Sequence, residues 1–205
     1  MPQLARLDGR VARSVRTRHA VVDALLDLLN EGDLRPTAAR IAERAGVSLR
    51  LVFHHFDDLE TIYSELAGRQ TERIKPLIAP IPVELPLSER IERFCAQRGR
   101  VLETLSPVRR AAVLIEPFRP ALARELRRAR ALKRAAAIAA FEPELAQLPA
   151  DQKSATAAAL NVATSWDAWE QMCRHQQLSE TEARRVMATT IGALLTNRNS
   201  SERPN

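Results

Sequence analysis

The sequence contains little cysteine, which forms disulfides and metal sites, and little glycine, which forms phosphate-binding loops. Its 205 residues include two cysteines, Cys95 and Cys173, which are far apart and form no CxxC pair, so neither a zinc site nor a disulfide framework is expected. With six glycines and neither GxGxxG nor GxxxxGKS/T, a Gly-rich phosphate loop is excluded. No run approaches the roughly 18–20 apolar residues of a membrane span, and residues 1–20 lack the apolar region of a secretory signal. We therefore expect a cytoplasmic chain with no cofactor, no metal and no membrane partner.

Patterns typical of catalysis are also missing. The sequence contains no HExxH, GxSxG or Glu-x-x-His motif that would indicate a metalloprotease, a serine hydrolase or a carboxylate-bridged metal site in a helical bundle. We therefore expect that the protein is not an enzyme.

Strand patterns are absent as well, and helical periodicity takes their place. Hydrophobic residues make up 45% of the chain and aromatic residues only 4%, a composition typical of an Ala/Leu-rich helical protein. We predict an all-α fold, divided by the Pro-rich segment 77–86 into an N-terminal domain, residues 1–75, and a C-terminal helical domain, residues 76–205.

Apolar spacing, caps and prolines predict the limits of the helices. Residues 1–15 are expected to form a loose basic arm and residues 197–205 a disordered tail. Thr37 and Ser48 are predicted N-caps, while Asp57 with Glu60 and Ser179 with Glu182 are predicted capping boxes. The predicted helices cover residues 16–30, 38–45, 49–56, 58–76, 88–105, 107–115, 120–141, 151–177 and 180–196.

Residues 37–56, TAARIAERAGVSLRLVFHHF, predict a helix-turn-helix in which Gly46 makes the turn. In such a motif the second helix lies in the major groove and presents its N-terminal residues to the bases. Arg50 would contact the O6/N7 edge of guanine, and Leu49 and Leu51 would contact thymine methyl groups.

This segment resembles the tetracycline-repressor (TetR) family of bacterial transcription regulators. The resemblance is carried by Ile41-Ala42, Ala45-Gly46-Val47-Ser48, Phe53-His54-His55-Phe56 and Leu59-Glu60. It implies a homodimeric repressor that reads a palindromic operator in double-stranded DNA and is released when an unidentified small-molecule effector enters the C-terminal bundle.

Three positions depart from the family pattern. The family usually has a phosphate-binding Tyr where Phe53 stands, often a Lys at Leu59, and a small or hydroxylated residue at Leu51. The expected contacts to the DNA backbone are then made by Thr37, His54, the helix N-termini and either Arg16 or Arg18. Of the two adjacent histidines, one is expected to contact a phosphate and the other to pack against the protein. The expected DNA-binding residues are Thr37, Ser48, Leu49, Arg50, Leu51, Phe53, His54 and His55. The departures also leave open a helical interaction protein with a degenerate helix-turn-helix.

The net charge of +6 lies mostly outside this motif. Residues 98–134 carry eleven basic and three acidic side chains. We interpret them as a solvated helix face; the alternatives are a second nucleic-acid surface, or Arg109, Arg110 or Arg119 turned inward to pair with an acidic effector.

Residues 151–196 are predicted to dimerise. Ala155, Ala159, Val162, Trp166, Trp169 and Cys173 form a heptad stripe, expected to face the core, and the last helix could join it in a four-helix interface. Alternatively, Phe118, Trp166, Trp169 and Met172 would line a ligand cavity.

Overall fold

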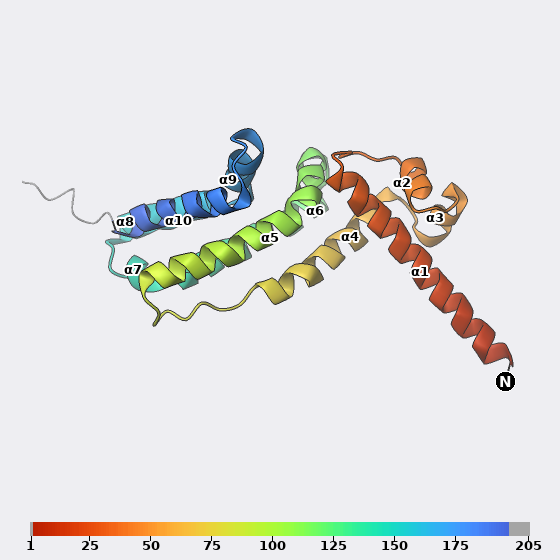
Figure 1. Ribbon diagram of the computed structural model, residues 1–205, viewed down its shortest axis with the longest axis horizontal. Helices are drawn as coiled ribbons and strands as arrows, with labels where there is room; N and C mark the ends of the chain where they lie inside the picture. Colours follow the sequence, from red (N-terminus) through yellow and green to blue (C-terminus); the bar gives the residue numbers. More distant parts are fainter. Residues whose placement is uncertain (1, 197–205) are drawn as a thin grey trace, which may run out of the picture. The chain divides into compact units, whose positions relative to one another are not determined.

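A computed structural model describes the backbone of residues 2–196; the side chains of residues 2–10 and Ala121 are outside this description. Within these limits every regular element is helical, which confirms the expected all-α class. None of these helices is both long and apolar enough to cross a membrane. The α-helices, labelled in Figure 1, are α1 (Pro2–Asn30), α2 (Ala38–Arg44), α3 (Leu49–His55), α4 (Leu59–Ile74), α5 (Leu87–Ile115), α6 (Pro120–Ala140), α7 (Glu142–Leu145), α8 (Ala150–Ala163), α9 (Trp166–Glu170) and α10 (Glu180–Thr196).

The chain divides into two compact units. The first contains residues 1–75 together with residues 107–115 at the end of α5, and the second contains residues 76–106 and 116–205. The segment between α4 and α5 is non-helical from Ile78 to Pro86, after the short 3₁₀ turn η1 (Lys75–Leu77).

The core of the first unit is built from one face of α1 and the helices packed on it. Val22, Leu25 and Leu29 of α1 are fully buried, because the apolar residues of this amphipathic helix recur every three or four positions. They pack with Ile41, Val52, Phe56, Ile62, Leu66 and Ala111.

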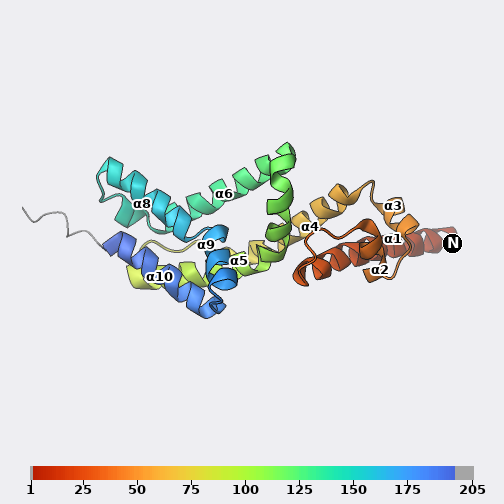
Figure 2. The same ribbon diagram turned by 90° about the horizontal axis from the view of Figure 1, so that it is seen from above.

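The core of the second unit lies among α5, α6, α8 and α10 (Figure 2). Phe94 of α5 meets Phe141, at the end of α6, edge to face, with their ring centres 5.3 Å apart. Leu160 of α8 and Ile191 of α10 complete this core from the other side. Helices α8 and α10 lie side by side.

The prediction of a loose arm at residues 1–15 was wrong, because these residues continue α1 as one helix from Pro2. Pro2 can occupy the first turn of a helix, where its missing N–H costs nothing, and no second proline follows it before Pro36. The end near Gly32 was predicted correctly; this glycine has φ +93°, a left-handed conformation that favours glycine.

The prediction of two helices separated at Pro107 was also wrong. Helix α5 runs unbroken from Leu87 to Ile115 with Pro107 inside it. A proline in a helix interior removes one backbone hydrogen bond, and packing on both sides of it can offset that loss. Here the residues before Pro107 are packed in the second unit and those after it in the first.

The long helix predicted over residues 151–177 is interrupted, contrary to expectation. Helix α8 ends at Ala163, and Ser165 caps a new helix, α9, by accepting a hydrogen bond from the Ala168 N–H at 3.1 Å. A π-helical segment, η3 (Gln171–His175), follows it. The expected core stripe is broken accordingly, since Val162 is 65% exposed.

The predicted caps have mixed outcomes. Ser179 and Glu182 form the predicted capping box of α10, with the Ser179 N–H donating to the Glu182 carboxylate at 2.8 Å. The box predicted from Asp57 was wrong by one residue, because Asp58 caps α4 by accepting from the Thr61 N–H at 2.8 Å. The tail, residues 197–205, lies outside the described residues.

Candidate nucleic-acid interface

Helices α2 and α3 are both fixed at their N-termini by the caps that the sequence predicts. The Thr37 hydroxyl accepts from the Arg40 N–H at 3.3 Å, and the Ser48 hydroxyl accepts from the Leu51 N–H at 3.2 Å. Gly46 has φ +66° between them, which allows the tight turn. Buried Ile41 and Val52 then hold the two helices on the core, so α2 and α3 form a helix-turn-helix.

The outward side of α3 carries most of the expected base-reading residues. Leu49 is 42% exposed and Phe53 is 50% exposed, and Arg50 and His54 are exposed beside them. Arg50 makes no hydrogen bond or ion pair within the described residues, so its guanidinium is available to a partner. Leu51, by contrast, is half-buried and turns toward α1.

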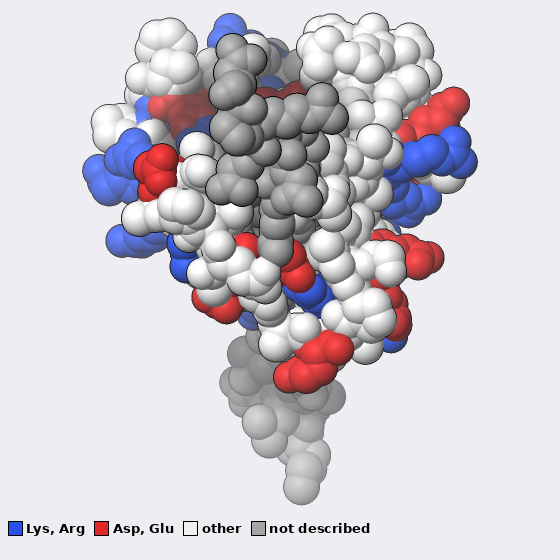
Figure 3. Space-filling model, turned by 90° about the vertical axis from the view of Figure 1, so that its left-hand side faces the viewer, with Lys and Arg blue, Asp and Glu red and all other residues white. Residues whose placement is uncertain are grey.

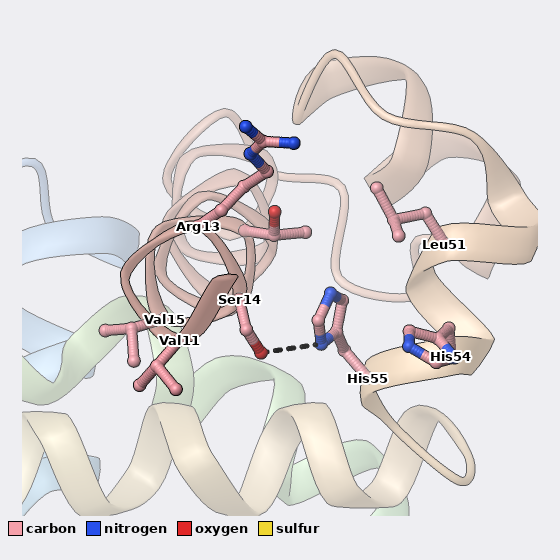
Figure 4. A pocket seen from close by; sticks show the side chains of 8 residues that line it. Val11, Arg13, Ser14, Val15, Leu51, His54 and His55 are labelled. Atoms are coloured by element: carbon pink, nitrogen blue, oxygen red, sulfur yellow. Dashed lines mark hydrogen bonds between the residues drawn. The ribbon is translucent and has the colours of Figure 1, made fainter. Parts of the chain in front are cut away.

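A cleft of about 690 Å³ separates α3 from the N-terminal half of α1. Figure 4 shows Leu51, His54 and His55 on one side of it and residues of α1 on the other, including Arg13 and Ser14. The Ser14 hydroxyl and the His55 Nδ1 atom lie 3.5 Å apart across it. The expected arm residues thus form one wall of a structured cleft beside α3.

The two adjacent histidines have different surroundings. His54 is exposed, whereas His55 is half-buried against α1. Burial lowers the pKa of His55 below its ordinary value of 6.5, and the neighbouring His54 and Arg18 lower it further. His55 is therefore neutral at pH 7, which suits a packing role. No cluster of three potential metal ligands occurs in the part of the chain that the structure describes.

From the sequence, either Arg16 or Arg18 was expected to contact a DNA phosphate. In the structure, Arg18 of α1 instead binds groups within the first unit. Its Nη1 atom donates to the His55 carbonyl oxygen, at the end of α3, at 2.6 Å. Its Nε and Nη2 atoms donate to the Glu65 carboxylate of α4 at 3.1 and 2.5 Å. The guanidinium also lies 4.4 Å from the ring centre of Phe56. Arg18 thus ties the end of α3 to α1 and α4, and Arg16 is the exposed member of the pair.

Glu65 receives a second arginine, Arg69, at 2.8 Å. Burial alone raises the pKa of Glu65, but the hydrogen bonds from Arg18 and Arg69 outweigh it and hold the pKa below its ordinary value. Sequence reasoning missed this network, because its members are 47 residues apart and an arginine on an amphipathic helix carries no mark of its partner.

The four expected ligand residues differ in burial. Trp169 and Met172 belong to the core of the second unit, and Trp166 packs against that core while its indole N–H donates to the Ser106 hydroxyl at 3.1 Å. Phe118 is 76% exposed in the 3₁₀ turn η2 (Glu116–Phe118) and takes no part in the core. Three of the four residues thus lie in or against one core, and their role in ligand binding stays a prediction.

Two arginines of α6, both within the basic segment 98–134, have acidic partners. Arg128 pairs with Glu125 and Arg130 with Glu116, each at 2.8 Å. On the face of the protein in Figure 3, basic and acidic side chains are mixed around the margin. Arg109 and Arg110 are half-buried and Arg119 is exposed, whereas Arg90 and Arg98 are the deeply buried arginines among the residues whose side chains are described.

The chain thus consists of an N-terminal unit that contains a helix-turn-helix and a second unit that is helical throughout its described residues. Solved structures share this architecture over most of the chain. A transcriptional regulator from Rhodococcus sp. Rha1 has a TM-score of 0.66 and 17% identity, over 88% of this chain and 96% of its own. A TetR-family regulator from Streptomyces coelicolor has a TM-score of 0.61 and 18% identity, over 87% of this chain and 79% of its own. One from Pseudomonas syringae pv. tomato has a TM-score of 0.59 and 20% identity, over 87% and 94%.

The chain therefore has the fold of the TetR-family transcriptional regulators, as the sequence resemblance predicted. No protein-family model matches the sequence, and no curated protein sequence is significantly similar to it.

Proposed function

We propose that this protein is a non-catalytic, DNA-binding transcriptional regulator that acts in the cytoplasm as a repressor. Residues 1–75 would bind DNA, and residues 76–205 would dimerise and receive a small-molecule effector. The observation that carries the proposal is the outward face of α3, where Arg50 has no partner within the described residues, on a helix that caps and Arg18 hold in place.

In the proposed complex, α3 lies in the major groove and Arg50 donates two hydrogen bonds to a guanine. Leu49 contacts a thymine methyl group, and Phe53 packs beside the backbone. The N–H groups at the starts of α2 and α3, with Thr37, Ser48 and His54, meet phosphates. His55 supports α3 from behind, and Arg13 and Arg16 of α1 add positive charge beside it.

The test is footprinting on the DNA upstream of the protein's own gene. Wild-type protein is expected to protect a palindromic site, and Arg50→Ala is expected to relax base choice at one position in each half-site and cost about 1–3 kcal/mol of binding free energy. Arg100→Ala is a matched control, because Arg100 is an exposed arginine of the second unit. If the wild-type protein protects no intergenic DNA, the proposal fails.

Dimerisation is proposed through α8 and α10. Both helices leave small or apolar side chains uncovered in the single chain: Ala155, Ala158 and Val162 on α8, and Val186, Thr189 and Ala193 on α10. Two such pairs, related by a two-fold axis, would bury these faces as a four-helix interface. A Val162→Glu variant is expected to sediment as a monomer and to lose binding to the full palindrome.

One observation favours a second candidate function. Leu49 and Phe53 give α3 an exposed apolar component, which would also suit a helical interaction protein whose helix-turn-helix no longer binds DNA. The salt dependence of DNA binding separates the two, because a true DNA interface releases counterions and its affinity falls steeply with salt.

A further inference from the structure

Helix α5 carries two deeply buried arginines in the second unit, eight positions apart in the sequence. The first, Arg90, is 3% exposed and makes four hydrogen bonds. It donates to the Leu85 carbonyl oxygen at 3.0 Å and to the Ala140 carbonyl oxygen at 2.8 Å. Its two Nη atoms also donate to the two oxygens of the Glu144 carboxylate. Arg90 therefore has the counter-charge and the acceptors that a buried guanidinium needs.

The second, Arg98, is 7% exposed but lacks such a set. Its Nη2 atom donates to the Lys133 carbonyl oxygen at 2.8 Å, and its guanidinium lies 4.9 Å from the ring centre of Phe94. Among the described residues no carboxylate pairs with it, and no other hydrogen bond satisfies its remaining donors.

The Arg98 nitrogens that make no hydrogen bond are still accessible to solvent. In the described part of the chain, the one fully enclosed side-chain nitrogen or oxygen without a hydrogen bond is Oε1 of Gln70. The unbonded nitrogens of Arg98 consequently keep some accessible area, although the residue as a whole is buried. A small group can approach donors that lie at the edge of an apolar core.

The charge of Arg98 persists despite its burial. Burial lowers its pKa to about 10, although Cys95 opposes this, so the guanidinium is still positive at neutral pH. Cys95 cannot balance that charge, because burial raises the pKa of its thiol to about 12. A buried positive charge without a counter-ion is costly, and an anion placed there would remove the cost.

We propose that Arg98 is the anion-binding residue of the effector site, and that the effector is a small monocarboxylate with an apolar body. The carboxylate would take the two free edges of the guanidinium, and the apolar part would lie against Phe94 and Cys95. A single negative charge matches the single unbalanced positive charge. This inference rests on the proposed function, since it names the effector of the same regulator.

The test uses benzoate and hexanoate as probes, with benzamide and hexanamide as uncharged counterparts, on the full chain. Thermal unfolding and titration calorimetry are run on wild type, Arg98→Met, Arg98→Lys and Arg100→Met. The last is the matched control, because Arg100 is exposed two residues further along α5. We expect at least one carboxylate to raise the Tm of wild type and of Arg100→Met, and its amide to have no effect.

The Arg98 variants make the test specific. Arg98→Met should bind the carboxylate at least tenfold more weakly, and Arg98→Lys should fall between, because an ammonium cannot form two parallel hydrogen bonds. Without ligand, Arg98→Met should melt no lower than wild type, since it removes an unbalanced buried charge. A large loss of stability in that variant would show that Arg98 is structural and overturn the proposal.

Two further results would also overturn it: carboxylates that stabilise wild type no more than their amides, or an equal response of Arg98→Met. Footprinting on the same samples separates this proposal from the proposed function. DNA protection without a carboxylate effect rejects only the anion site, whereas carboxylate binding through Arg98 without DNA protection rejects the regulator.

Discussion

Replacing Arg18 by Met tests whether this arginine holds the recognition helix or contacts DNA. The hydrogen bond from its charged guanidinium to the His55 carbonyl oxygen is worth about 1.5 kcal/mol. The contact with the Phe56 ring adds about 0.5–1 kcal/mol. The ion pair with Glu65 is partly exposed and adds no more than about 1 kcal/mol. We expect Arg18→Met to lower the free energy of unfolding of the first unit by roughly 2–3 kcal/mol.

The loss should be concentrated at the end of α3. If α3 opens locally, hydrogen exchange of its last amides should accelerate by roughly 30- to 100-fold, because each 1.4 kcal/mol is a factor of ten. DNA affinity should fall while its salt slope stays the same, since no phosphate contact is removed. Denaturant unfolding, hydrogen exchange and fluorescence anisotropy measure these three quantities.

Arg69→Met is the matched control. Arg69 also contacts Glu65, but its other partner is Asp23 of α1, whereas Arg18 also binds the end of α3. It should cost less than about 1 kcal/mol and leave exchange in α3 unchanged. Equal losses in both variants would refute the proposed clamp. A salt slope reduced by about one, with unchanged stability, would instead show that Arg18 contacts a phosphate.

The contribution of this network should also depend on pH. Because the pKa of Glu65 is lowered in the folded protein, its stabilising effect is complete above its ordinary value of 4.5 and is lost as the pH falls through the folded value. The difference in unfolding free energy between wild type and Arg18→Met should therefore shrink below about pH 4.5. A difference that stays constant down to pH 2 would contradict the role given to this carboxylate.

Four further substitutions test other parts of the fold. Gly46→Ala should destabilise the first unit by about 1–2 kcal/mol, because φ is +66° there. Gly68→Ala should stabilise it by about 0.5–1 kcal/mol, because alanine is favoured over glycine inside a helix such as α4. Thermal melts followed by circular dichroism should shift in opposite directions. Arg90→Met should cost about 3–5 kcal/mol, because it takes the arginine away from the largely enclosed Glu144 carboxylate, and a cost below 1 kcal/mol in denaturant unfolding would contradict this. Gln70→Met should raise stability by about 1 kcal/mol, because it removes a buried oxygen without a hydrogen bond; a lower denaturation midpoint would argue against that reasoning.

Features that depend on neighbouring residues were the ones the sequence could predict. The caps at Thr37, Ser48 and Ser179 were predicted correctly, because a cap joins a side chain to a backbone N–H two or three residues away. Asp57 and Asp58 are chemically equal candidates for one cap, so local reasoning could not separate them. Pro107 misled for the opposite reason, since packing of distant elements on α5 overrode a local rule.

The candidate site divides in the same way. The helix-turn-helix and its outward residues follow from the pattern of residues 37–56, although their roles in binding stay predictions. The partners of Arg18 and the isolation of Arg98 depend on which distant groups the fold brings near them. The 28 arginines of this chain look alike in the sequence, and only folding separates those paired on the surface from those enclosed.

The shared helix α5 sets where this protein can be cut or recombined. Residues 107–115 belong to the first unit, and Ala111 is part of its core, so a fragment ending at Lys75 would expose the apolar surface that Ala111 covers. Grafting the first unit onto another regulator at the Pro-rich segment would leave a hole in its core for the same reason. A working chimaera would have to take the turn of helix around Ala111 along with residues 1–75, because the first unit is assembled from two separate stretches of the chain.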